Sequence, residues 1–86
     1  MTDYTVRRTR GADKALAAIE KRERARIEAA VALLAETPRP PKARKLVGAG
    51  DRWRVRVGDY RILYEIHEGE LVILVIRIVH RREVYR

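Results

Sequence analysis

Residues 53–66, WRVRVGDYRILYEI, alternate apolar and polar side chains on both sides of Gly58-Asp59. This period of two is typical of half-buried strands, and a short glycine-containing pair between two such runs predicts a hairpin with a two-residue loop. Because a two-residue loop fixes the register, Arg56 is expected directly opposite Arg61. The hairpin is the strongest constraint that this sequence places on its fold.

The two faces of this hairpin differ in chemistry. Like charges opposite each other in a sheet are unfavourable, and two guanidinium groups about 6 Å apart repel by roughly 1–3 kcal/mol. A solvated basic face is one explanation; a bound phosphate, which matches guanidinium forks in charge and geometry, is the explanation we favour. The apolar face carries Trp53, Val55, Val57, Tyr60, Ile62, Tyr64 and Ile66, and the opposite face carries Arg54, Arg56 and Arg61.

The remaining segments predict one α+β domain covering residues 1–86, since a chain of this length cannot support two cores. The expected architecture is an antiparallel β-sheet of about four strands with a two-helix hairpin packed on one face, in the order strand, helix, helix, then three strands. Helical spacing starts near Ala12, where Thr9 or Asp13 can cap the helix, and a second, longer helix ends before the TPRPP segment. The expected strands cover residues 3–8, 53–57, 60–67 and 70–79, and residues 37–52 form a basic connecting loop.

The arginine face should become apolar farther from the hairpin loop. If Glu68-Gly69 is also a two-residue turn, this part of the face carries Leu63, Val72, Leu74 and Ile76. Large exposed apolar patches on monomers usually mark interfaces, so either the chain's own C-terminal tail or a partner is expected to cover it.

Composition limits the chemistry. Lys and Arg number 20 against 12 Asp and Glu, so the net charge of +8 favours a polyanionic partner. The chain has no Cys and no Ser, which removes the usual thiol and hydroxyl nucleophiles, and two His without Cys make a metal site at the His80-x-x-Glu83 spacing improbable. We therefore expect no metal and no cofactor. The apolar run at residues 71–79 is too short to span a membrane, and the lack of a secretory signal predicts a cytoplasmic protein.

RNA cleavage is one reaction that such a site can perform without a metal. The ribose 2′-hydroxyl attacks the adjacent phosphorus, so the protein has to position the RNA, stabilise negative charge and move protons. Arginines supply the charge stabilisation, while Tyr85 and His80 are candidates for proton transfer. His67, beside a turn, is better interpreted as a turn residue.

Three segments resemble the RelE/ParE superfamily of toxins from type II toxin–antitoxin systems: KLVG at residues 45–48, WRVRVGDYRILYEI at 53–66 and HRREVYR at 80–86. The resemblance implies a growth-inhibiting toxin that is neutralised by an antitoxin encoded beside it. In the RelE branch the toxin enters the ribosomal A site and cleaves mRNA by 2′-hydroxyl attack. ParE relatives poison DNA gyrase and cleave nothing.

The resemblance also assigns roles to individual residues. It implies that Arg61 and Arg81 stabilise the phosphate and that Tyr85 is the catalytic tyrosine. Arg54 and Arg56 stand where the ribosome-dependent nuclease has lysines, and arginine stays protonated, so neither can act as a base. Either Tyr85 or His80 must then act as the base, or the nuclease is slow or the activity is a different one. We favour Tyr85 as the base, with His80 the proton donor to the leaving oxygen. The residues expected to bind RNA phosphates are Arg54, Arg56, Lys45, Arg52 and Arg44.

The expected partners follow from this resemblance and from the charge. They are mRNA and the ribosome, a RelB-like antitoxin whose acidic and apolar segment wraps the toxin, and operator DNA only through the antitoxin complex. No membrane partner is expected. Three functions remain open at this point: a ribosome-dependent endoribonuclease, a gyrase poison, and a non-catalytic basic module that binds nucleic acid.

Overall fold

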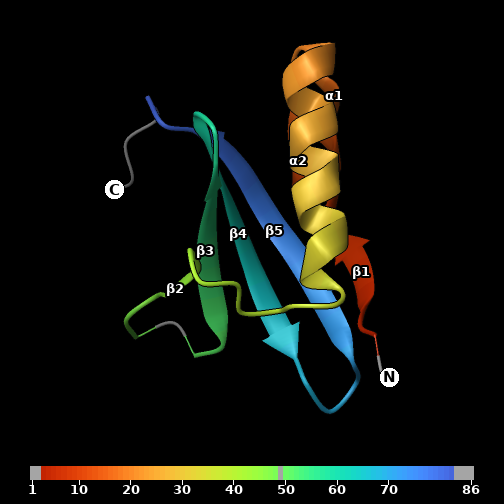
Figure 1. The fold of residues 1–86 in the computed structure, drawn as a ribbon, viewed down its shortest axis with the longest axis vertical. Coiled ribbons are helices and arrows are strands. Elements are labelled where there is room, and N and C mark those ends of the chain that lie inside the picture. The colour runs from red at the N-terminus through yellow and green to blue at the C-terminus, as the bar shows by residue number, and fades with distance from the viewer. Residues whose placement is uncertain (1–2, 49, 83–86) are drawn as a thin grey trace.

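The computed structural model describes residues 3–48 and 50–82 of the 86-residue chain. A short strand is followed by two helices and then by four further strands (Figure 1). The elements are β1 (Thr5–Arg8), α1 (Arg10–Ala17), α2 (Lys21–Leu34), β2 (Arg44–Lys45), β3 (Arg52–Val57), β4 (Tyr60–His67) and β5 (Val72–His80). The predicted α+β class and the predicted order of helices and long strands are confirmed.

The sheet has the strand order β1-β5-β4-β3-β2 and is mixed, not wholly antiparallel. β3, β4 and β5 form the expected antiparallel meander, because short loops join them. β1 instead pairs in parallel with β5, the last strand of the meander. The basic loop contributes the fifth strand, β2, which was not expected, beside β3.

The connection between β4 and β5 is longer than the two-residue turn that Glu68-Gly69 suggested. β4 ends at His67 and β5 begins at Val72, with Leu71 in the left-handed region at φ 56°. Backbone bonds from Glu70 to His67 and from Leu71 to Glu68 close this connection. The start of the last strand therefore moves from residue 70 to residue 72.

The core lies between the helix pair and one face of the sheet, with both helices on the same side of β3, β4 and β5 (Figure 1). Thr9 caps α1: its Oγ1 accepts a hydrogen bond from the Ala12 backbone N–H at 3.1 Å. No helix in the described part of the chain is long and apolar enough to cross a membrane. The buried apolar residues include Leu16, Ile27, Val31, Leu34, Val55, Ile62, Tyr64, Ile66, Ile73, Val75 and Ile78.

Candidate nucleic-acid interface

The register of the β3–β4 hairpin is the one that the sequence predicted. Val57 pairs with Tyr60 and Arg56 pairs with Arg61 across a two-residue loop. Gly58 has a positive φ of 58°, a conformation that glycine adopts at little cost. Cross-strand neighbours share a face, so the two arginines lie on the same side of the sheet with Cα atoms about 4.5–5.5 Å apart.

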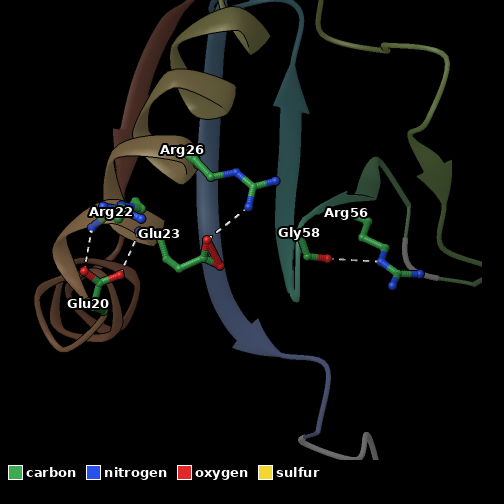
Figure 2. Close-up of polar contacts among 6 residues, drawn as sticks. All are labelled: Glu20, Arg22, Glu23, Arg26, Arg56 and Gly58. Atoms are coloured by element: carbon green, nitrogen blue, oxygen red, sulfur yellow. Dashed lines mark hydrogen bonds and ion pairs between the residues drawn. The ribbon is translucent and has the colours of Figure 1, made fainter.

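Arg26 closes the hairpin turn from the helix side. A Cβ atom on residue 58 would lie 3.1 Å from Nη1 of Arg26, and the same Nη1 bonds Glu23 at 3.0 Å. On the opposite side, Nε of Arg56 donates to the Gly58 carbonyl at 3.2 Å (Figure 2). The turn is therefore held between one arginine from α2 and one from β3.

We call the sheet face that does not carry the helices the outer face. Its side chains form rows across the strands, because each strand pairs residue by residue with its neighbour. From the Gly58 end, the rows are Arg56, Arg61 and Val79; then Arg44, Arg54, Leu63 and Arg77; then Arg52, Glu65, Leu74 and Arg7; then His67, Val72 and Thr5. Arginines thus surround a narrow apolar strip.

A β-bulge in β5 decides which of its side chains join the outer face. Tyr64 pairs with Val75 while Leu63 pairs with Arg77, so Ile76 has no opposite residue. The extra residue reverses the alternation along the rest of the strand. Arg77 consequently faces outward, whereas His80 faces the helix side.

Thr9 holds this bulge in place from the opposite edge of β5. Its Oγ1 donates to the Ile76 carbonyl at 2.7 Å, and its backbone N–H donates to the Val75 carbonyl at 3.0 Å. The residue that caps α1 therefore also satisfies the carbonyl that the bulge leaves unpaired.

Among the residues in these outer-face rows, Glu65 is the single carboxylate. It accepts a hydrogen bond from Nε of Arg52 at 2.8 Å and lies 2.9 Å from Nε2 of His67. The hydrogen bond from Arg52, aided by His67 and opposed by partial burial, holds the pKa of Glu65 below its ordinary value. Arg52 is therefore partly neutralised, whereas the side chains of Arg54 and Arg77 form no ion pair with any described carboxylate.

The basic loop is anchored so that β2 reaches the outer face. The buried Tyr64 hydroxyl donates to the Pro38 carbonyl at 2.7 Å. The Arg39 guanidinium lies 5.4 Å from the centre of the Trp53 ring and 3.3 Å from Glu68. These contacts place Arg44 beside Arg54.

The remaining predicted site residues are distributed differently. The Arg81 backbone N–H donates to the Asp59 carbonyl at 2.7 Å, and its Nε lies 3.7 Å from the Asp59 carboxylate, which keeps Arg81 at the turn end of the sheet. His80 packs edge-to-face on Tyr60, with ring centres 5.0 Å apart, on the helix side. Lys45 pairs with Trp53 and therefore also lies on the helix side. Tyr85 lies outside the described residues.

The structure thus brings together Arg44, Arg52, Arg54, Arg56 and Arg61, and it does not bring His80 or Lys45 to them. Sequence reasoning missed Arg77 and Arg7 as members of the outer face. A predicted pairing of β1 with β5 would have placed Arg7 on the outer face, beside Leu74. Arg77 could not have been placed there from the sequence, because no local pattern marks the bulge at Ile76.

A second surface feature lies on the helix side, at the β3 edge. A groove of about 590 Å³ runs between the C-terminal half of α2, the loop at residues 37–42 and β3. Leu33, 61% exposed, lines it together with Pro40, Pro41 and Val57. This apolar groove opens on the helix side and meets the outer face at Arg56, which also lines it.

The mixed sheet with the helix pair on one face is the fold of RelE/ParE toxins, as the comparisons with known proteins show. The family described as "ParE toxin of type II toxin-antitoxin system, parDE" has a model that matches residues 6–85. The chain therefore belongs to this family of toxins. No curated protein sequence matches the chain significantly.

Solved RelE structures share the fold. The RelE–RelB complex from Pyrococcus horikoshii OT3 contains a chain 30% identical to this one, with a TM-score of 0.83 and coverage of 98% of this chain and 100% of that one. The RelBE2 complex of Mycobacterium tuberculosis gives 29% identity, a TM-score of 0.72 and coverage of 92% and 99%. The intact Escherichia coli RelBE complex gives 21% identity, a TM-score of 0.80 and coverage of 96% and 99%, a likeness of fold alone.

Proposed function

We propose that this toxin is a ribosome-dependent endoribonuclease that cleaves mRNA in the ribosomal A site and thereby inhibits translation and growth in the cytoplasm. The observation that carries the proposal is the placement of Arg56 directly opposite Arg61 on the outer face, with Arg54 in the next row. Two guanidinium groups on neighbouring positions of one face form a site of positive charge, and guanidinium forks match phosphate oxygens in geometry. The likeness to RelE structures also supports this function.

In the proposed reaction, the ribose 2′-oxygen forms a bond to the adjacent phosphorus while the bond from phosphorus to the 5′-oxygen breaks. The products are a 2′,3′-cyclic phosphate and a 5′-hydroxyl. Arg56 and Arg61 neutralise the charge that develops on the phosphate, Arg81 assists from the turn end, and Arg54, Arg52 and Arg44 hold neighbouring phosphates.

Proton transfer cannot fall to the arginines, which stay protonated. We assign the general base to Tyr85, in agreement with the family resemblance of the HRREVYR segment. His80 is a weaker candidate for the proton donor, because it faces Tyr60 on the helix side of the sheet.

Neutralisation by an antitoxin completes the proposal. The similar structures from P. horikoshii, M. tuberculosis and E. coli are toxin–antitoxin complexes, which supports a RelB-like partner for this chain. We propose that an acidic and apolar segment of this partner masks the arginine rows and the apolar strip between them. Operator DNA would then be bound only by the toxin–antitoxin complex.

A second function, poisoning of DNA gyrase, has its own support. The matching family model is that of ParE toxins. In addition, residues 54 and 56 are arginines where the ribosome-dependent nuclease has lysines. A gyrase poison would use the basic outer face as a protein-binding or DNA-binding surface, without cleavage.

The deciding experiment expresses the toxin under tight control and reads out translation and DNA integrity separately. The nuclease proposal predicts mRNA cuts at codon positions on translating ribosomes, and it predicts that Arg61→Gln and Tyr85→Phe both abolish them. Arg22→Gln, which removes the same charge from an exposed position on α2, is the matched control and should cut normally.

Gyrase-dependent DNA breaks without mRNA cuts would establish the second function instead. Full cutting activity in both Arg61→Gln and Tyr85→Phe would overturn the assigned site. A wild-type chain without toxicity that binds nucleic acids without sequence preference, in a salt-sensitive way, would identify a non-catalytic binding module.

A further inference from the structure

The bulge in β5 gives the outer face an arginine that a regular strand would have turned toward the core. Val75 is buried on the helix side, and two residues later a regular strand would again point inward. Because Ile76 is the extra residue, Arg77 instead pairs with Leu63 and is exposed on the outer face. Bulges often occur next to functional sites, where they redirect a side chain.

Arg77 completes a row that crosses most of the sheet. Arg54 pairs with Leu63, and Leu63 pairs with Arg77, so one half-buried leucine separates the two arginines. Two strand spacings place their Cα atoms about 9–10 Å apart. The next row toward the turn holds Arg56 and Arg61, the pair proposed to bind the reacting phosphate.

Resting on the proposed RNA-cleaving function, we propose that Arg77 binds a second RNA phosphate, next to the reacting one, and that Leu63 forms the apolar floor on which the intervening base lies. The RNA would cross the sheet from the Arg56–Arg61 row to the Arg54–Leu63–Arg77 row. Guanidinium groups bind phosphate in a bidentate way and also stack on base faces, so both flanking arginines suit single-stranded RNA.

The charge of this row favours a polyanion as its occupant. Arg54 and Arg77 form no ion pair with any carboxylate among the described residues, and Glu65 lies one row away, engaged by Arg52 and His67. An acidic antitoxin segment is the competing occupant. If RNA occupies the row, replacing Arg77 should weaken RNA binding. If the antitoxin segment occupies it, the same replacement should leave RNA binding unchanged and weaken antitoxin binding.

The test measures binding of the full-length toxin to a single-stranded 2′-O-methyl RNA oligonucleotide, which lacks the attacking hydroxyl and cannot be cleaved. Arg77→Gln should weaken binding about threefold to tenfold. It should also make the dependence of log K on log salt shallower by about 0.7, the contribution of one phosphate contact on a single strand. Arg22→Gln is the matched control for charge and should change neither quantity.

The outcomes separate this inference from the proposed function. Wild-type affinity and salt dependence in Arg77→Gln, with weakened binding in Arg61→Gln, would overturn the role of Arg77 and leave the proposed RNA site standing. Unchanged RNA binding in both variants would remove the RNA site itself. If Arg77→Gln leaves RNA binding unchanged but weakens an acidic antitoxin peptide, the row belongs to the antitoxin and the inference fails.

A shorter probe strengthens the test. An RNA dinucleotide that fills only the Arg56–Arg61 row should bind equally to wild type and to Arg77→Gln. A loss of dinucleotide affinity equal to the loss for the longer RNA would show that Arg77 acts on the fold or on the first row, which would overturn a separate phosphate contact.

Discussion

Gly58 and Arg26 lie so close together that a Cβ atom at residue 58 would be 3.1 Å from the Arg26 guanidinium. This contact joins the hairpin turn, from which the arginine rows begin, to α2. The turn is thus positioned by the helix layer as well as by its own glycine.

Gly58→Ala is expected to lower the free energy of unfolding by about 1–2 kcal/mol. Alanine at a φ of 58° is strained, and its methyl group also displaces Arg26. Gly69→Ala is the control, because a Cβ there meets nothing within 4 Å, and it should change stability by less than about 0.5 kcal/mol. Urea unfolding measures the free energy of unfolding of both variants. Equal losses of stability in Gly58→Ala and Gly69→Ala would contradict the role given to the Gly58 turn.

Removing the Tyr64 hydroxyl should destabilise the protein and change its behaviour in alkali. Tyr64→Phe leaves the Pro38 carbonyl without its 2.7 Å donor, at a cost of about 1–2 kcal/mol at neutral pH. Burial raises the pKa of Tyr64 to about 12 from 10.0, with Arg39 acting in the opposite direction. The folded chain therefore holds this proton more tightly than the unfolded chain does. Between about pH 10 and pH 12 the free energy of unfolding of the wild type should fall by about 2–3 kcal/mol, a fall that Tyr64→Phe does not show.

Urea midpoints of both proteins across this alkaline range provide the measurement. Parallel curves for wild type and Tyr64→Phe would show that the hydroxyl is not buried as the structure has it.

Acid sensitivity should depend on Glu65. The hydrogen bond from Arg52 keeps the folded-state pKa below the ordinary value of 4.5, so the stabilising contribution is present above that pH and is lost as pH falls through the lower folded-state value. Glu65→Gln should therefore show a shallower fall in stability on acidification. Chemical unfolding of both proteins from neutral to acid pH measures this difference. An equally steep fall in stability for wild type and Glu65→Gln would contradict the prediction.

The same variant should bind RNA more tightly. Glu65→Gln removes the carboxylate that engages Arg52, which frees that guanidinium for phosphate. Glu28→Gln, at an exposed position on α2, changes the net charge equally and should have a smaller effect. Titrations of both variants with an RNA oligonucleotide at one salt concentration measure the change in affinity. An equal increase in RNA affinity for both variants would show that the effect comes from net charge and not from release of Arg52.

Thr9 should stabilise the fold through two elements at once. Thr9→Ala removes the N-cap of α1 and the donor to the Ile76 carbonyl, so the free energy of unfolding should fall by about 1–2 kcal/mol or more. Thr9→Ser keeps the hydroxyl and should recover most of the loss. Failure of serine to recover it would assign the effect to the lost methyl group.

Local patterns in the sequence were sufficient to predict which face each side chain of the β3–β4 hairpin lies on. They were insufficient to predict this for β5. The two-residue loop at Gly58-Asp59 fixes the partner of every β3 residue, so Arg54, Arg56 and Arg61 could be placed on one face before the structure was known. In β5, one extra residue at Ile76 turns Arg77 outward and His80 inward. Its hydrogen-bond partner, Thr9, lies far away in sequence, so no local signal reports the bulge.

The parallel partnership of β1 with β5 and the addition of β2 were missed for the same reason. Both are contacts between segments that the chain brings together only after folding. Pairing across a short connection can be predicted, because few backbone geometries close a short loop. The pairing of edge strands depends on tertiary contacts that the local sequence does not show.

The pairing of β1 with β5 also bears on how this protein is made. β1 is synthesised before every other element, yet its hydrogen-bonding partner in the sheet is β5, the last strand in chain order. A nascent chain must therefore wait with its first strand unpaired until β5 has left the exit tunnel. The five-stranded sheet that carries the arginine rows is therefore completed only after β5 has formed.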